Sequence, residues 1–76
     1  MIKKASEMVK NESGIIEDIS GYKNELECMG LVKGCVIIVK SDKNEKITVI
    51  SQRNNQGSEI ILLNLVASKI LVNITK

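Results

Sequence analysis

Residues 24–39 read NELECMGLVKGCVIIV, and this stretch organises the rest of the chain. Asn24 is suited to cap a first helical turn, and Glu27, three residues later, can reach back to the Asn24 backbone N–H, as in a capping box. Gly30 stands where helices commonly end in a left-handed residue. The pattern therefore predicts a short helix over Asn24–Met29 that ends at Gly30.

A second glycine turn follows this helix end. Leu26 and Leu31 are spaced for the apolar contact that accompanies a Schellman motif. Leu31–Gly34 predicts a tight turn, and the β-branched run Cys35–Val39 predicts a buried strand. Helix, glycine stop, tight turn and core strand thus form one compact unit.

Short apolar runs on both sides of this unit predict four more strands, at residues 14–19, 47–51, 60–63 and 69–74. In the strand at 14–19, Ile15 and Ile19 would share one face by strict alternation, whereas Ile16 and Ile19 would lie on opposite faces, so the sequence indicates two different inward faces. A β-bulge in this strand would reconcile the two patterns.

The segments between the strands carry turn and helix signals. Residues 1–4 are expected to form a loose end. Two single helical turns are predicted, one over Ser6–Val9 and one over Asn64–Ser68, each capped by its first residue. Residues 40–46 contain no apolar side chain and predict a solvated hairpin connection, and residues 53–57 supply turn residues.

The composition fits one small β domain. The chain has 76 residues, enough for a single domain, and 43% of them are apolar. These are mostly Ile, Val and Leu, and Tyr22 is the only aromatic residue, which favours sheet packing of branched aliphatic side chains. We therefore expect a mainly β fold over residues 1–76, a small antiparallel β-barrel of about five strands.

The order of motifs along the chain carries a resemblance. The central motif, from Leu26 to Gly34, is L-x-x-M-G-L-x-x-G. It is preceded at 14–19 by G-x-I-x-x-I. It is followed at 57–62 by G-x-x-I-x-L and at 67–72 by A-x-x-I-x-V. Together these motifs resemble the FeoA family, small cytoplasmic accessory proteins of bacterial ferrous-iron transport. The resemblance covers residues 6–72 and implies one SH3-like barrel with a short helix between its first two strands.

No catalytic site is indicated. His is absent, and no nucleophile or acid–base group has a recognisable partner, so we expect no enzyme activity and no catalytic residues. No glycine-rich phosphate loop occurs, and no cofactor is implied. Cys28 and Cys35 lack the spacing of a zinc module, so we expect buried or half-buried free thiols in a reduced, cytosolic chain.

Direct metal binding is not indicated either. The candidate oxygen ligands are scattered among lysines, and their spacing does not predict that they lie close together in the fold. These carboxylates are Glu12, Glu17, Asp18, Glu25, Glu27 and Glu59. We therefore expect no metal ligands, and a connection with iron would run through a partner.

The composition also narrows the class of partner. A net charge of +2 is too small to indicate nucleic acid or an anionic membrane, and no segment approaches the ~18 apolar residues of a membrane helix. With Tyr22 as the only aromatic residue, the chain cannot build an aromatic groove for proline-rich peptides or a stacking platform for single-stranded nucleic acid. We expect a protein partner, no nucleic acid and no membrane insertion.

The resemblance implies docking on the cytoplasmic GTP-binding domain of the ferrous-iron transporter FeoB, with modulation of uptake. The chain would then be cytoplasmic, and peripheral to the inner membrane only through that partner. The candidate partner-binding residues lie in the central unit and are Leu26, Met29, Gly30, Leu31, Val32 and Gly34.

Several alternatives stay open at this point. Leu26, Met29 and Leu31 can all be core residues instead of an exposed patch, and Gly30 and Gly34 are expected to shape the two turns. A metal-responsive regulatory module is the second functional hypothesis, because SH3-like domains resembling FeoA also occur at the C-terminal end of DtxR-type iron-dependent repressors. A nucleic-acid-binding barrel is the third and weakest hypothesis, and steeply salt-dependent binding would be its signature. A weak homo-oligomer is also left open.

Overall fold

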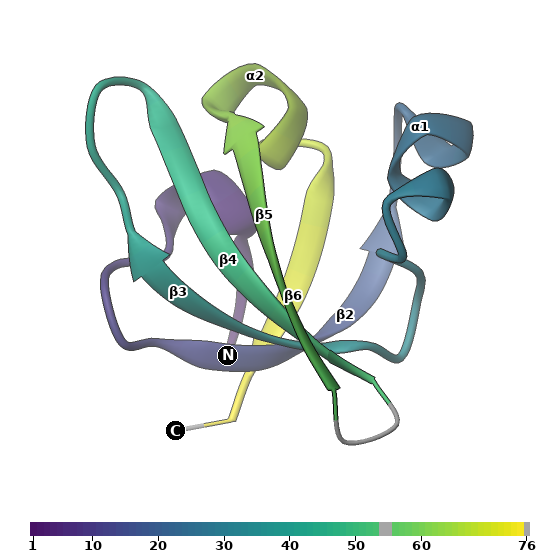
Figure 1. Ribbon diagram of the computed structural model, residues 1–76, viewed down its shortest axis with the longest axis horizontal. Coiled ribbons are helices and arrows are strands. Elements are labelled where there is room, and N and C mark those ends of the chain that lie inside the picture. The colour runs from purple at the N-terminus through teal and green to yellow at the C-terminus, as the bar shows by residue number, and fades with distance from the viewer. Residues whose placement is uncertain (54–55, 76) are drawn as a thin grey trace.

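A computed structural model describes residues 1–53 and 56–75 of the chain (Figure 1). In chain order its elements are β1 (Ile2–Lys4), the 3₁₀ turn η1 (Ala5–Glu7), β2 (Ser13–Ile19), α1 (Lys23–Cys28), β3 (Val36–Ser41), β4 (Lys46–Arg53), β5 (Gln56–Leu63), α2 (Asn64–Ala67) and β6 (Ile70–Ile74). The predicted turn at 53–57 falls on residues 54–55, which lie outside the described residues.

The strands form one antiparallel sheet in the order β1-β6-β2-β3-β4-β5. Figure 1 shows this sheet curling round so that β5 and β6 pass close to each other in projection, with α1 and α2 at its rim. The predicted mainly β, antiparallel fold with a short helix is confirmed. Over the described residues the sheet has six strands instead of five, and its two ends do not close into a complete barrel.

The additional strand is β1, where a loose end was expected. Its sequence, Ile-Lys-Lys, has little apolar character, so the pattern of side chains does not mark it as a strand. Backbone pairing with β6 orders it instead: Ile2 pairs with Asn73 and Lys4 with Leu71. An ion pair of 3.0 Å between Lys3 Nζ and Glu12 Oε2 adds a side-chain contact to this pairing. The prediction of a loose N-terminus was therefore wrong.

The predicted bulge in β2 is confirmed. The register of β2 against β6 shifts between Ile16 and Asp18, which allows Ile16 and Ile19 to face inward while Ile15 faces outward. Gly14 lies where β2 crosses β6 closely, because an added Cβ would lie 2.5 Å from Val72 Cγ1 and 2.6 Å from the Asn73 carbonyl oxygen.

The core fills the inside of the curled sheet with aliphatic side chains. Its fully buried large members come from all parts of the chain and are Met8, Ile16, Leu26, Leu31, Ile37, Val39, Ile47, Val49, Ile70 and Val72. On β6, Ile70 and Val72 are buried and Ile74 packs against the core, as the alternation in the sequence predicts.

The predicted helix caps were wrong, although the helical turns exist. α1 begins at Lys23, after Tyr22 in a left-handed conformation with φ of 59°, so Asn24 lies inside the first turn. In η1 the backbone N–H of Lys4 donates to Glu7 Oε1 at 3.2 Å, and Ser6 is not the cap. α2 has Leu63 as its N-cap because the Asn64 N–H still donates to the Glu45 carbonyl as part of the strand pairing.

The predicted hairpin connection after β3 is confirmed. Asn44 and Glu45 both have positive φ, 58° and 60°, and the Lys46 N–H donates to the Lys43 carbonyl at 3.0 Å. This geometry is a type I′ turn, the two-residue turn whose twist suits an antiparallel hairpin.

Candidate docking groove between β2 and α1

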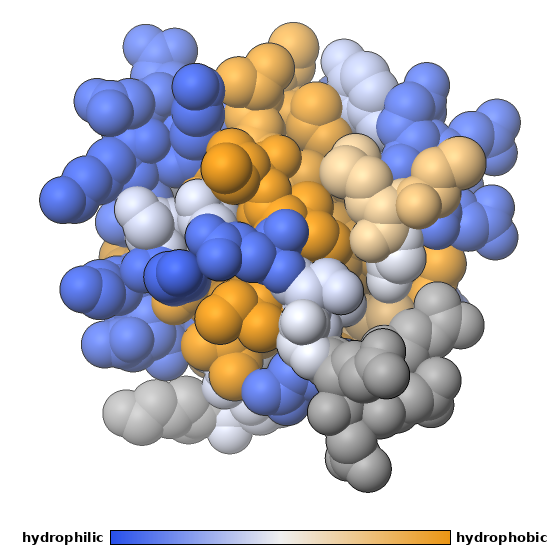
Figure 2. All heavy atoms as spheres, viewed as in Figure 1, coloured by the Kyte–Doolittle hydropathy of each residue, from blue (hydrophilic) through white to orange (hydrophobic). Residues whose placement is uncertain are grey.

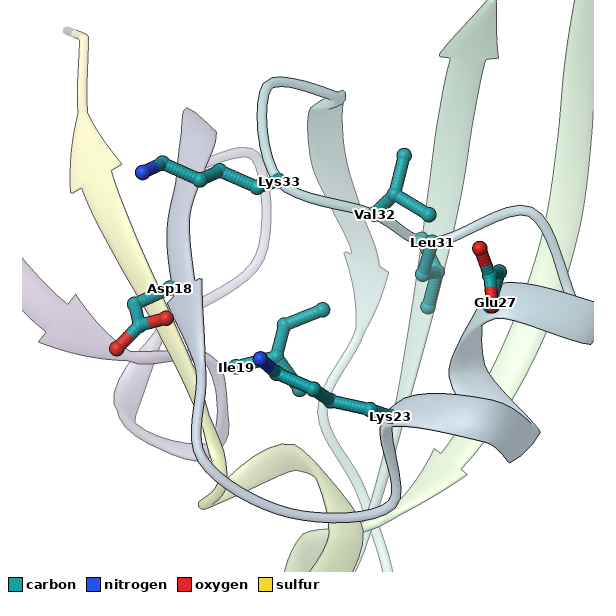
Figure 3. A pocket seen from close by; sticks show the side chains of 7 residues that line it. All are labelled: Asp18, Ile19, Lys23, Glu27, Leu31, Val32 and Lys33. Atoms are coloured by element: carbon teal, nitrogen blue, oxygen red, sulfur yellow. The ribbon is translucent and has the colours of Figure 1, made fainter.

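A pocket of about 200 Å³ lies where the end of β2, helix α1 and the connection from α1 to β3 meet (Figure 3). Its lining combines apolar side chains with charges of both signs and consists of Asp18, Ile19, Lys23, Glu27, Leu31, Val32 and Lys33. We call this pocket the α1 groove. Four of its seven lining residues lie within Leu26–Gly34, inside the stretch 24–39 that organises the sequence, and the other three come from β2 and the start of α1.

The floor of the α1 groove is apolar and its rim is charged. Ile19 is 7% exposed and Leu31 is 1% exposed, so both belong to the core, while Val32 is partly buried against it. Figure 3 shows Asp18 on the strand side of the groove and Glu27 on the helix side. This arrangement can hold one aliphatic side chain of a partner and surround it with exposed charges.

The first glycine turn fixes the end of α1 beside the groove. Gly30 has φ of +89°, its N–H donates to the Glu27 carbonyl at 3.0 Å, and the Leu31 N–H donates to the Leu26 carbonyl at 2.8 Å. These two hydrogen bonds define the Schellman motif that the sequence predicts. Leu26 and Leu31 are both buried, which supplies the apolar contact of the motif.

The second glycine turn joins the groove to the sheet. The Cys35 N–H donates to the Val32 carbonyl at 3.1 Å, and Gly34 has φ of +95°, which is a type II turn. The Gly34 N–H then donates to the Ile16 carbonyl at 2.8 Å, and the Ile16 N–H donates to the Cys35 carbonyl at 2.9 Å. The segment from 32 to 35 is therefore held rigidly against β2.

The structure divides the candidate partner-binding residues into three kinds. Leu26 and Leu31 are core residues, 0% and 1% exposed. Met29 is 40% exposed and Val32 is partly buried, so these two offer side chains at the surface. Gly30 and Gly34 shape the turns through their positive φ, as expected, and an added Cβ at either would meet no atom within 4 Å.

The two thiols also differ. Cys35 is buried, with its Sγ 3.5 Å from the Gly30 carbonyl oxygen, and Cys28 is exposed. The expectation that both would be buried or half-buried was therefore wrong for Cys28. In so short a helix only the side facing Leu26 is covered, and a residue two positions later points about 200° away around the helix.

A model of one protein family matches nearly the whole chain. The family is described as the FeoA domain, and the match covers residues 3–74. The chain belongs to the FeoA family. Membership associates this FeoA chain with ferrous-iron transport, and it places the chain in a family of small accessory domains.

The fold of this FeoA chain is also that of a solved structure. The crystal structure of an iron uptake regulatory protein (FeoA) superposes with a TM-score of 0.87, covering 99% of this chain and 100% of that chain at 24% sequence identity. At that identity the likeness concerns the fold. A search of curated proteins gave no match.

Several groove residues of the FeoA chain were not predicted as site residues. Ile19 was assigned only to a strand, and Asp18 and Glu27 were counted among the scattered carboxylates. Lys23 and Lys33 were given no role in a site. The signal available in the sequence is the spacing of Lys23 and Glu27, which at i and i+4 share one side of a helix. The position of Asp18 and Lys33 beside them depends on the pairing of residue 16 with the turn at 34–35, which the sequence does not state.

Two kinds of feature are absent from the described residues of the FeoA chain. Within residues 1–53 and 56–75, no group of three or more His, Cys, Asp or Glu side chains is close enough to hold a metal ion. Across the same two ranges, no helix has the length and apolar character needed to cross a membrane.

Proposed function

We propose that this FeoA chain is an accessory protein of ferrous-iron uptake that docks on the GTP-binding domain of the transporter FeoB. Docking would use the α1 groove together with Met29, whose exposed side chain lies at the end of the same helix. The observation that supports this proposal is the coincidence of the groove with the family motif at Leu26–Gly34, in a chain that matches the family over residues 3–74. The site of action is the cytoplasm, at the inner face of the membrane.

The contact would have an apolar centre and a polar rim, as protein interfaces commonly do. An aliphatic side chain of the partner would enter between Ile19, Leu31 and Val32, and Met29 would widen the apolar contact. Lys23, Glu27 and Lys33 would set orientation and association rate more than affinity, because their charges are exposed to solvent.

The first test is an NMR titration of ¹⁵N-labelled chain with the isolated GTP-binding domain, with and without a non-hydrolysable GTP analogue. Chemical-shift changes confined to residues 18–34 are the expected result. Changes concentrated on other elements, or none in either nucleotide state at concentrations of about 1 mM, would overturn the proposal.

A matched pair of variants separates docking from folding. Met29→Lys adds a cation next to the groove, and Val9→Lys adds the same charge at a side chain that is 52% exposed in the loop before β2. We expect Met29→Lys to weaken binding about tenfold or more, which corresponds to a loss of about 1.4 kcal/mol or more of binding free energy. Val9→Lys should leave the affinity for the GTP-binding domain unchanged. Both variants should keep the dispersed amide spectrum of the folded chain. Leu26→Asp is unsuitable because it would place a charge in the core.

A further inference from the structure

The two edges of the sheet are very different. β1 is three residues long and carries two lysines, Lys3 and Lys4, which are features that protect a sheet edge from pairing with another chain. β5 pairs with β4 over eight successive residues in unbroken register, from Gln56 to Leu63, and the chain has no proline to interrupt it. Within the described part of the chain, β5 ends the strand order. It is therefore a long edge open to another strand.

The direction of the backbone groups shows which residues this edge presents. The Asn64 N–H donates to the Glu45 carbonyl at 2.9 Å, toward β4. Since these groups alternate in direction along an antiparallel strand, the N–H and C=O groups of Glu59, Ile61 and Leu63 point away from β4, to the open edge. A second strand placed there would form the next ladder of the sheet.

The side chains at this edge are apolar and exposed. Ile61 is 64% exposed and Leu63 is 54% exposed, while their neighbours Ile60 and Leu62 face the core. Leu65, at the start of α2, is 65% exposed. Figure 2 shows hydrophobic side chains gathered over α2 and the adjoining end of β5, with hydrophilic residues around them.

We propose that β5 pairs with β5 of a second copy of this chain, antiparallel and about a two-fold axis at Ile61. A two-fold axis makes the interface self-complementary, so that Ile61 faces its own copy and Glu59 faces Leu63 of the other chain. The two sheets then continue into one. This assembly is independent of the α1 groove, which lies on β2 and α1.

The charges favour this register. Lys46 pairs with Leu63 across β4 and β5, so both side chains lie on the same face of the sheet. In the two-fold pairing Glu59 of one chain lies opposite Leu63 of the other, with Lys46 of that other chain on the next strand. Lys40 already pairs with Glu59 at 3.2 Å within each chain. Glu59 therefore lies between Lys40 of its own chain and Lys46 of the other chain. No two side chains of like charge lie directly opposite each other across the two β5 strands.

Sedimentation velocity over a concentration series tests the assembly. The expected result is a mass that rises with concentration from 8.4 kDa, the mass of one chain, toward twice that value. Ile61→Lys places two ammonium groups on the two-fold axis and is expected to raise the dimer dissociation constant more than about tenfold. Ile2→Lys, at a residue that is 57% exposed on β1, adds the same charge at the other edge and should leave the dimer intact.

Cross-linking tests the register. In a Cys28→Ser background, Ile61→Cys places two Cα atoms about 5.5 Å apart, within disulfide range, and oxidised glutathione should link them. Leu63→Cys places its two copies about 13 Å apart along the strands and should not cross-link. A monomer up to about 1 mM, equal weakening by both lysine variants, or equally fast cross-linking at both positions would overturn the proposal.

Discussion

At the scale of single residues, the hairpin after β3 contains a residue poorly suited to its backbone conformation. Glu45 has φ of 60° in the second central position of the type I′ turn, where the left-handed conformation costs a side-chain-bearing residue about 1–2 kcal/mol. Asn44 occupies the first central position, and Asn-Gly is the preferred pair in such turns.

Glu45→Gly is therefore expected to stabilise the chain by about 1 kcal/mol. Urea unfolding followed by circular dichroism measures the change. Lys43→Gly, two residues earlier at the first position of the turn, has no positive φ to relieve and should be neutral or destabilising, because glycine gains entropy in the unfolded chain. Equal effects of the two variants would contradict the explanation.

Two glycines should respond differently to alanine. At Gly30 an added Cβ meets no atom within 4 Å, so Gly30→Ala costs only the backbone strain of its φ of +89°, about 1–2 kcal/mol. At Gly14 the Cβ would lie 2.5 Å from Val72 Cγ1 and 2.6 Å from the Asn73 carbonyl oxygen. Gly14→Ala must separate β2 from β6 and should cost more. Denaturant midpoints of the two variants give the order directly, and the reverse order would refute this account.

At the scale of elements, Glu12 connects β1 to the loop between η1 and β2. Its carboxylate accepts from the Val9 N–H at 3.0 Å and from Lys3 Nζ at 3.0 and 3.1 Å. The hydrogen bond from Val9 and then that from Lys3 lower the pKa of Glu12 below its ordinary value of 4.5. Ionised Glu12 thus favours the folded state.

The sign of the pH effect follows from this lowered pKa. A carboxylate with a depressed pKa in the folded state contributes stability above its unfolded pKa and loses it as the pH falls through the folded pKa. Glu12→Gln should therefore be less stable than the parent at pH 7, and the difference should shrink below pH 4.5. Thermal melts at a series of pH values test this. A pH-independent difference would mean that packing, and not charge, explains the loss.

The elements differ in how far the sequence predicts them. Strands with alternating or continuous apolar runs, such as β3 and β6, were correctly predicted, because burial of these side chains is what orders them. The turns at Gly30 and Gly34 were also correctly predicted, because a backbone conformation with positive φ strongly favours glycine. β1 was missed because backbone pairing orders it. The predictions of the helix caps were wrong because Tyr22 and Leu63, residues with no capping tendency, precede the helices. Tyr22 has a left-handed conformation, and after Leu63 the Asn64 N–H still donates to the Glu45 carbonyl of the strand pairing.

The candidate site shows the same limit. The segment that carries it was predicted from its motif, but Leu26 and Leu31 are buried, and Asp18 and Ile19 complete the groove from β2. Periodicity assigns a residue to a face of its own element. It does not say which element lies opposite, and the groove exists only between two elements.

At the scale of the whole molecule, the first and last described strands, β1 and β6, lie side by side. β6 lies between β1 and β2, and the Ile74 N–H donates to the Met1 carbonyl at 2.8 Å. Removal of residues 1–4 would expose the outer edge of β6 and break the Lys3–Glu12 ion pair. We expect a lower thermal midpoint and faster amide exchange in β6. Unchanged exchange at Val72 would show that β1 is dispensable.

This arrangement has a consequence for synthesis on the ribosome. β2 needs β6 on one side, and β6 is made after all the other described strands of this sheet. The nascent chain can form the hairpins β3–β4 and β4–β5 as they emerge, but Ile16 and Ile19 keep one flank uncovered until β6 leaves the exit tunnel. A stalled chain that ends before residue 70 should therefore remain sensitive to protease, and one in which β6 has emerged should be protected.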